Sequence, residues 1–159
     1  MSLTPPTAAK ACAILASRAY SAAATITALP APSPALAFVA TRLQQFGQHA
    51  EQLGDCLLNN AAAVSPALLA AVEQALPECD SAVGAISVRA VDGTGDVSAF
   101  SDVLAACSRM MIFAAQISTV GLGEEQETWL QHEEGRQLFS TVEGVSKQLL
   151  SPSGVSVPN

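Results

Sequence analysis

Non-polar side chains recur at alternating spacings of three and four residues in about five successive stretches of this 159-residue chain. This spacing is the period of an α-helix that buries one face, because 3.6 residues complete a turn. Each stretch spans about 22–27 residues, or roughly six to seven turns. Long helices joined by short loops form bundles. We therefore expect an all-α fold, specifically an antiparallel bundle of about five long helices.

The predicted helices share one type of buried seam, made mainly of alanine, leucine and valine. The spacing within the seams is near 3.5 residues, which favours left-handed, coiled-coil-like packing. The fifth seam is the sparsest, with Trp129 and Leu130 upstream of it. The seam residues are Cys12, Leu15, Ala19, Ala22, Ile26 and Leu29; Leu36, Val39, Leu43, Phe46, Ala50, Leu53 and Leu57; Leu69, Val72, Leu76, Cys79, Val83 and Ile86; Val97, Phe100, Leu104, Cys107, Met111 and Ala114; and Leu138, Val142, Val145 and Leu149.

Loop and cap residues separate the stretches. Thr4, Ser33 and Ser65 each precede a proline, and a hydroxyl followed by proline at the first helical position is a typical helix start. The breaks fall at residues 30–34, 59–65, 92–96 and 121–123. We expect residues 1–150 to form one domain and residues 151–159 a flexible C-terminal tail.

Proline and glycine residues inside the predicted helices indicate two special features. Pro77 lies within the third stretch, so we expect a kink there or a split near Ala75. Gly47 and Gly54 are seven residues apart and so share one face of the second helix. The simplest explanation for two small residues on that face is a close crossing by another helix.

The charge distribution disfavours nucleic-acid binding. The chain has a net charge of −7 with only 7 lysines and arginines, all scattered. Nucleic-acid binding depends on clustered basic side chains that neutralise phosphates, so we expect no nucleic-acid partner. Hydrophobic residues make up 50% of the chain and charged residues 13%, which is typical of a folded domain rather than a disordered segment.

Cysteine usage and apolar runs bear on the compartment. Cys12, Cys56, Cys79 and Cys107 show no zinc-site spacing, so we expect reduced, buried thiols; the alternative is two disulfides, with three possible connectivities. Two apolar runs, residues 11–29 and 103–123, contain Arg18 and Arg109. Arginine inside an apolar run disfavours a membrane span, so we expect a cytoplasmic protein.

Candidate catalytic and metal motifs are incomplete. His132 begins a His-Glu-Glu-Gly-Arg segment, but a zinc helix needs a second histidine where Arg136 stands. The acidic residues between Asp92 and Asp102 lack the glycine and glutamate of a calcium loop. We therefore expect no catalytic residue, metal or cofactor.

Five residues are candidates for an interface or a pocket. The cluster around Met110, Met111 and Phe113 is wider than one seam, which indicates either a central helix or a self-association face. Trp129 is the only tryptophan and stands among acidic residues, so it is an interface anchor or a cap on the core. His49 is near two carboxylates and is either a half-buried histidine or a general base.

Three stretches resemble the HeLo-like amino-terminal domains of fungal STAND receptors. They are the small apolar residues 11–29, the segment Leu-Gln-Gln-Phe at 43–46 leading to residues 53–58, and the segment from Pro66-Ala67-Leu68-Leu69 to residues 75–80. The resemblance implies a helical bundle that signals by self-association and whose first helix can contact membrane. Two departures are the Thr-Pro-Pro-Thr start at residues 4–7 and the lack of a following nucleotide-binding module.

Three functional hypotheses follow from these patterns. The first is a non-enzymatic signalling or interaction module that acts by helix–helix association with itself or a protein partner. The second is a small-molecule-binding or enzymatic bundle with an apolar internal pocket near the fourth helix. The third is a membrane-active domain whose first helix inserts into the bilayer.

Overall fold

The computed structural model describes residues 4–31, 33–93, 97–120 and 123–145. Within these ranges the regular elements are all helices, which confirms the predicted all-α class. The elements are α1 (Pro5–Thr27), α2 (Pro34–Asn59), the short 3₁₀ helix η1 (Ala61–Ala63), α3 (Pro66–Asp92), α4 (Val97–Ser118), α5 (Gly123–Gln131) and α6 (Glu133–Val142).

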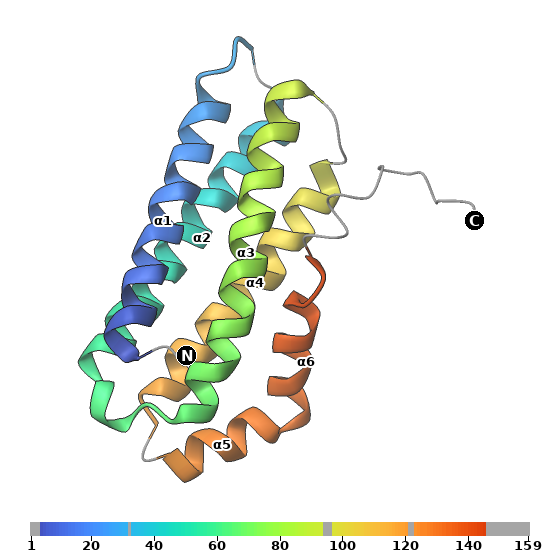
Figure 1. Ribbon diagram of the computed structural model, residues 1–159. Helices are drawn as coiled ribbons and strands as arrows, with labels where there is room; N and C mark the ends of the chain where they lie inside the picture. Colours follow the sequence, from blue (N-terminus) through green and yellow to red (C-terminus); the bar gives the residue numbers. More distant parts are fainter. Residues whose placement is uncertain (1–3, 32, 94–96, 121–122, 146–159) are drawn as a thin grey trace.

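The four long helices lie side by side and run in alternate directions along the chain (Figure 1). As a result α1 and α3 point the same way, while α2 and α4 point the opposite way. The helix α5 crosses the end of the bundle at which α4 finishes, and α6 then turns back along its side. The core lies between these helices, and its largest fully buried side chains include Phe46, Phe100 and Leu43.

The three predicted hydroxyl caps are confirmed. The side-chain oxygens of Thr4, Ser33 and Ser65 accept hydrogen bonds from backbone N–H groups three residues onward, at 3.3, 3.1 and 3.0 Å. Each cap satisfies one of the N–H groups that a helix start leaves without a partner. At the other end of α3, Gly93 adopts a left-handed conformation with a φ of 72°, which allows the chain to leave the helix.

The predicted close crossing at Gly47 and Gly54 is confirmed, and the crossing helix is α1. A Cβ atom on Gly47 would lie 2.7 Å from a ring carbon of Tyr20. A Cβ atom on Gly54 would lie 3.2 Å from the backbone oxygen of Ala9 and 3.3 Å from the Cβ atom of Cys12. The absence of side chains at these two positions therefore lets α1 and α2 approach each other closely.

The last helical stretch departs from the prediction, because it is two short helices instead of one long helix. The break is at His132, whose ψ of 144° is extended backbone. A Cβ atom on Gly135 would lie 2.6 Å from the backbone oxygen of Trp129 and 2.8 Å from the ring of Phe113. This tight turn lets α6 fold back and bury Val142 against the bundle.

Pro77 does not split α3, because the helix is continuous from Pro66 to Asp92. A proline inside a helix removes one N–H donor and leaves the carbonyl group four residues earlier without its helical partner. Pro77 is exposed, so water can reach this side of the helix and hydrogen-bond to that carbonyl group.

Among the described residues, α4 is the one helix that is long and apolar enough to cross a membrane. A core helix satisfies the same criterion, and α4 has core contacts. Met110, Met111 and Ala114 are fully buried inside the bundle.

Candidate functional site: the groove between α1 and α3

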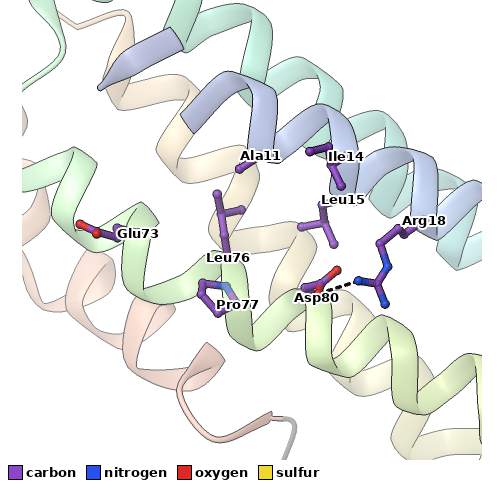
Figure 2. A pocket seen from close by; sticks show the side chains of 8 residues that line it. All are labelled: Ala11, Ile14, Leu15, Arg18, Glu73, Leu76, Pro77 and Asp80. Carbon is purple, nitrogen blue, oxygen red and sulfur yellow. Dashed lines mark hydrogen bonds and ion pairs between the residues drawn. The ribbon is translucent and has the colours of Figure 1, made fainter. Parts of the chain in front are cut away.

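The neighbouring helices α1 and α3 leave an open groove between them, which we call the α1–α3 groove. Its first hollow, of about 410 Å³, lies toward the start of both helices, and its second hollow, of about 390 Å³, lies toward their ends. The first hollow is lined by Ala11, Ile14, Leu15, Arg18, Glu73, Leu76, Pro77 and Asp80, and Figure 2 shows these side chains. The second is lined by Ser17, Arg18, Ser21, Ala22, Thr25, Val83, Gly84, Ser87 and Val88.

Small side chains explain why the groove is open. Apart from Arg18, the residues of α1 that line the second hollow are serine, alanine and threonine, and on α3 Gly84 and Ser87 lie between the larger Val83 and Val88. These small residues are too short to fill the space between two helix axes. A Cβ atom on Gly84 would have one neighbour within 4 Å, Nη2 of Arg18, at an ordinary contact distance of 3.5 Å, so this residue has room for a methyl group beneath the guanidinium group.

An ion pair bridges the groove between its two hollows. Nη1 of Arg18, on α1, donates a hydrogen bond to Oδ2 of Asp80, on α3, at 2.9 Å (Figure 2). Arg18 lines both hollows. The side chains of Arg18 and Asp80 are 50% and 39% exposed, so water competes for both charges. An ion pair of this kind contributes about 0–1 kcal/mol to stability.

Large apolar side chains are exposed along the groove. Ile14 on α1 is 53% exposed and Val88 on α3 is 61% exposed. Val91, one turn beyond Val88, is also exposed. Single exposed apolar residues are ordinary, but several beside an apolar groove are typical of a surface that another molecule covers.

The residues predicted for an interface or pocket lie away from this groove. Met110, Met111 and Phe113 are buried in the core, where Phe113 contacts Phe139 of α6 in an edge-to-face arrangement with ring centroids 6.3 Å apart. Trp129 on α5 is 46% exposed and its ring lies 6.1 Å from that of His132. The structure therefore buries three of the five candidate residues in the core and does not bring the five together.

His49 is half-buried on α2, and its Nδ1 atom is buried without a hydrogen-bond partner. Burial lowers the pKa of His49 below 6.5, because desolvation disfavours the charged imidazolium. The nearby carboxylate of Glu51 instead accepts a hydrogen bond from Oη of Tyr20 at 2.8 Å. Thus Glu51 pairs with α1, across the helix crossing at Gly47.

Three of the four cysteines are buried, and all four are free thiols. Burial raises the pKa of Cys12 to about 12. A hydrogen bond with Cys107, followed by burial, raises the pKa of Cys79 well above its usual value. Among the described residues, no group of three His, Cys, Asp or Glu side chains is arranged to hold a metal ion.

One feature that the sequence did not reveal is the groove itself. Ile14, Gly84 and Val88 come from helices that are not adjacent in sequence, and nothing in the helical spacing identifies α1 and α3 as neighbours. A partial signal was present: the serines and glycine in these helices, which lie outside the predicted seams, indicate a face with little side-chain volume.

Comparison with known proteins yields no relative. No protein-family model matches the chain, and no curated protein or solved structure matches it either.

Proposed function

We propose that this chain is a non-enzymatic interaction module that binds another helix in the α1–α3 groove. One observation carries the proposal: two parallel helices leave a groove with two hollows, and Ile14 and Val88 stand exposed beside it. An amphipathic helix laid in such a groove would bury these side chains with its own apolar face.

The dimensions of the groove support a helical occupant. Arg18 lies between the two hollows, and the lining residues extend along α1 from Ala11 to Thr25. Fourteen residue steps of helix measure about 21 Å, which is the length of roughly four turns. The small side chains of the second hollow would let a third helix axis come close to both α1 and α3.

The resemblance to HeLo-like domains supports a signalling role for this association. In that reading, helix–helix contact is the event that transmits or executes the signal. The proposal extends to a cytoplasmic location and to contact with other copies of the chain or with a protein partner.

A second candidate function is the binding of a small apolar molecule. The observation that favours it is the first hollow, whose volume of about 410 Å³ falls within the range of about 300–1,000 Å³ for ligand pockets. The hollow is apolar on most sides and has Arg18, Asp80 and Glu73 at its edge, which could orient a polar group.

The test uses a displayed library of amphipathic helices selected against the whole protein. The binders should shift the backbone amide resonances of α1 and α3 in the NMR spectrum of the protein. Ile14→Asp should abolish binding, because it places a carboxylate in the contact. The matched control is Leu58→Asp, since Leu58 is 51% exposed but does not line the groove.

Two results would count against a helix-binding role. If the selected helices bind equally well to the Ile14→Asp and Leu58→Asp variants, the groove is not their site. If small apolar solutes shift the groove resonances and no helix does, the second candidate function replaces the first.

A further inference from the structure

We propose that residues 146–150 of the same chain, which we call the 146–150 segment, cover the first hollow of the α1–α3 groove. The segment reads Ser-Lys-Gln-Leu-Leu and lies outside the described residues. The described chain ends immediately before it, at the buried Val145. This inference rests on the proposed function and deepens it, because the segment then competes with a partner helix for the same surface.

A separate hollow, of about 360 Å³, lies between α3 and α6, and we call it the α3–α6 hollow. On the α6 side it is lined by Phe139, Ser140 and Glu143. On the α3 side, Glu73 and Pro77 line both this hollow and the first hollow of the α1–α3 groove. In Figure 1, α1 and α6 flank α3 on its two sides. The two hollows are therefore separated by the edge of α3 at Pro77.

The 146–150 segment begins close to the α3–α6 hollow and is long enough to reach the groove. Glu143, two residues before Val145, lines the α3–α6 hollow. A helix with its side chains is about 10–12 Å across. An extended chain advances about 3.3–3.6 Å per residue, so the four residue steps from Val145 to Leu149 span up to about 13–14 Å. The chain can thus cross the edge of α3 within these four steps.

The α3–α6 hollow is acidic, and the residues that reach it first include a lysine. The described residues that line this hollow include the carboxylates of Glu73, Glu78 and Glu143 and no lysine or arginine. Lys147 is the one charged residue of the segment. A lysine near partly exposed carboxylates gains only modest Coulomb attraction, so we expect this contact to direct the segment more than to hold it.

The first hollow of the groove is apolar at the place where the leucines of the segment arrive. Its walls include Leu76 and Ile14, and Ile14 is 53% exposed. Leu149 and Leu150 follow Lys147 directly after one glutamine, so the order of basic and apolar residues matches the order of the two hollows. Covering Ile14 with two leucines removes apolar surface from water, which is the main force that holds the segment.

Pro77 provides a hydrogen-bond acceptor at the crossing point. Because proline has no N–H group, the carbonyl oxygen of Glu73 lacks its helical donor. Both residues line both hollows, so this oxygen lies on the turn of α3 over which the segment passes. An N–H group of the segment can donate to it in place of water.

Disulfide trapping in the full chain tests this placement. Ser151→Cys puts a thiol directly after the segment, Ile14→Cys puts its partner in the first hollow, and Cys56→Ser removes the one native thiol that is not fully buried. Glutathione disulfide should then join the two new thiols within one chain, so the product stays monomeric on a non-reducing gel. A disulfide-linked dimer as the main product shows that another copy supplies the segment, which overturns the inference.

Two matched variants show whether the leucines hold the segment or whether proximity alone joins the thiols. Leu149→Asp with Leu150→Asp should slow trapping at least tenfold. Val155→Asp with Val157→Asp, later in the chain, should leave the trapping rate unchanged. Far-ultraviolet circular dichroism should show the same helix content in both variants. Equal trapping rates in the two variants contradict the inference.

Helix binding distinguishes this inference from the proposed function. A segment that occupies the groove for about nine-tenths of the time lowers the apparent affinity for a partner helix about tenfold. The variant that combines Leu149→Asp and Leu150→Asp should therefore bind the selected helices about tenfold more tightly than the wild type does.

Two results separate the two claims. Equal helix affinity of this variant and the wild type, together with trapping that does not depend on the leucines, refutes the docked segment and leaves the helix-binding role intact. Leucine-dependent trapping in a protein that binds no helix, even when Leu149→Asp and Leu150→Asp clear the groove, refutes the proposed function and leaves the docked segment intact.

Discussion

Replacing Gly47 with alanine tests how tightly α1 and α2 are packed. In an open helix this change should stabilise the fold by about 1 kcal/mol, because glycine is the poorer helix former. At this position the new Cβ atom would lie 2.7 and 2.9 Å from two ring carbons of Tyr20, well inside the usual carbon–carbon contact of about 3.5–4.0 Å. The ring must move by about 1 Å, which disturbs its hydrogen bond to Glu51.

The expected net effect follows from these two contributions. Overpacking costs about 1–3 kcal/mol, so a central cost of about 2 kcal/mol exceeds the helix-propensity gain of about 1 kcal/mol. Gly47→Ala should therefore lower the free energy of unfolding by about 1 kcal/mol. In a Tyr20→Ala background the obstacle is gone, and the same change should raise that free energy by about 1 kcal/mol.

Urea denaturation of dilute protein, followed by far-ultraviolet circular dichroism, measures these free energies in a double-mutant cycle. The expected coupling between positions 47 and 20 is about 2 kcal/mol. Gly84→Ala is the matched control, since its new Cβ atom would meet one group, Nη2 of Arg18, at an ordinary contact distance of 3.5 Å, and the change should stabilise the fold in either background. If Gly47→Ala stabilises the wild type as much as Gly84→Ala does, the argument for a tight crossing is wrong.

Four further measurements test individual groups. Tyr20 is the only tyrosine, and burial, then its hydrogen bond to Glu51 and that residue's charge, raise its pKa from 10.0 to about 12. The ultraviolet titration of Tyr20 should accordingly show one midpoint near 12, and Glu51→Gln should lower that midpoint. Because the unfolded state loses the Tyr20 proton at lower pH than the folded state does, the free energy of unfolding should fall as the pH rises from 10.0 toward 12. His49 should titrate by NMR with a pKa below 6.5. Because the unfolded state then binds more protons, the free energy of unfolding should decline as the pH falls through 6.5. His49→Gln should reduce that decline. A soluble thiol reagent should modify the half-buried Cys56 rapidly and the three buried cysteines only after unfolding. Rapid modification of all four thiols would contradict the burial of those three. Gln126→Ala should lower the free energy of unfolding by about 2–4 kcal/mol, measured by urea denaturation, because it removes the partner of the buried N–H group of Ser65 and of the part-buried carbonyl group of Ala63.

The sequence predicted those parts of the fold that depend on local chemistry. The caps at Thr4, Ser33 and Ser65 were predictable because a hydroxyl side chain bonds to an N–H group only three residues away. The close crossing was predictable because two glycines seven residues apart on one helix face leave room for a neighbour.

Features that depend on packing between distant segments were not predictable. The apolar spacing continues across His132, so a single long helix was expected; the break arises from the tight fit of Gly135 against Trp129 and Phe113. The helix continues past Pro77 because that residue is exposed. The candidate site escaped prediction for the same reason, since the pairing of Arg18 with Asp80 joins residues 62 positions apart.

The hydrogen bonds of the Gln126 side chain hold α5 in position at the end of the bundle. Its Oε1 atom accepts a hydrogen bond from the backbone N–H of Ser65 at 2.7 Å, while Nε2 donates to the carbonyl oxygens of Ala63 and Val120 at 2.7 and 3.4 Å. Sliding α5 by one residue would strand all of these groups in a water-poor environment. Shifted positions of α5 are therefore far less stable than the observed position. We expect α5 to detach from the bundle cooperatively, in one step, rather than fray turn by turn.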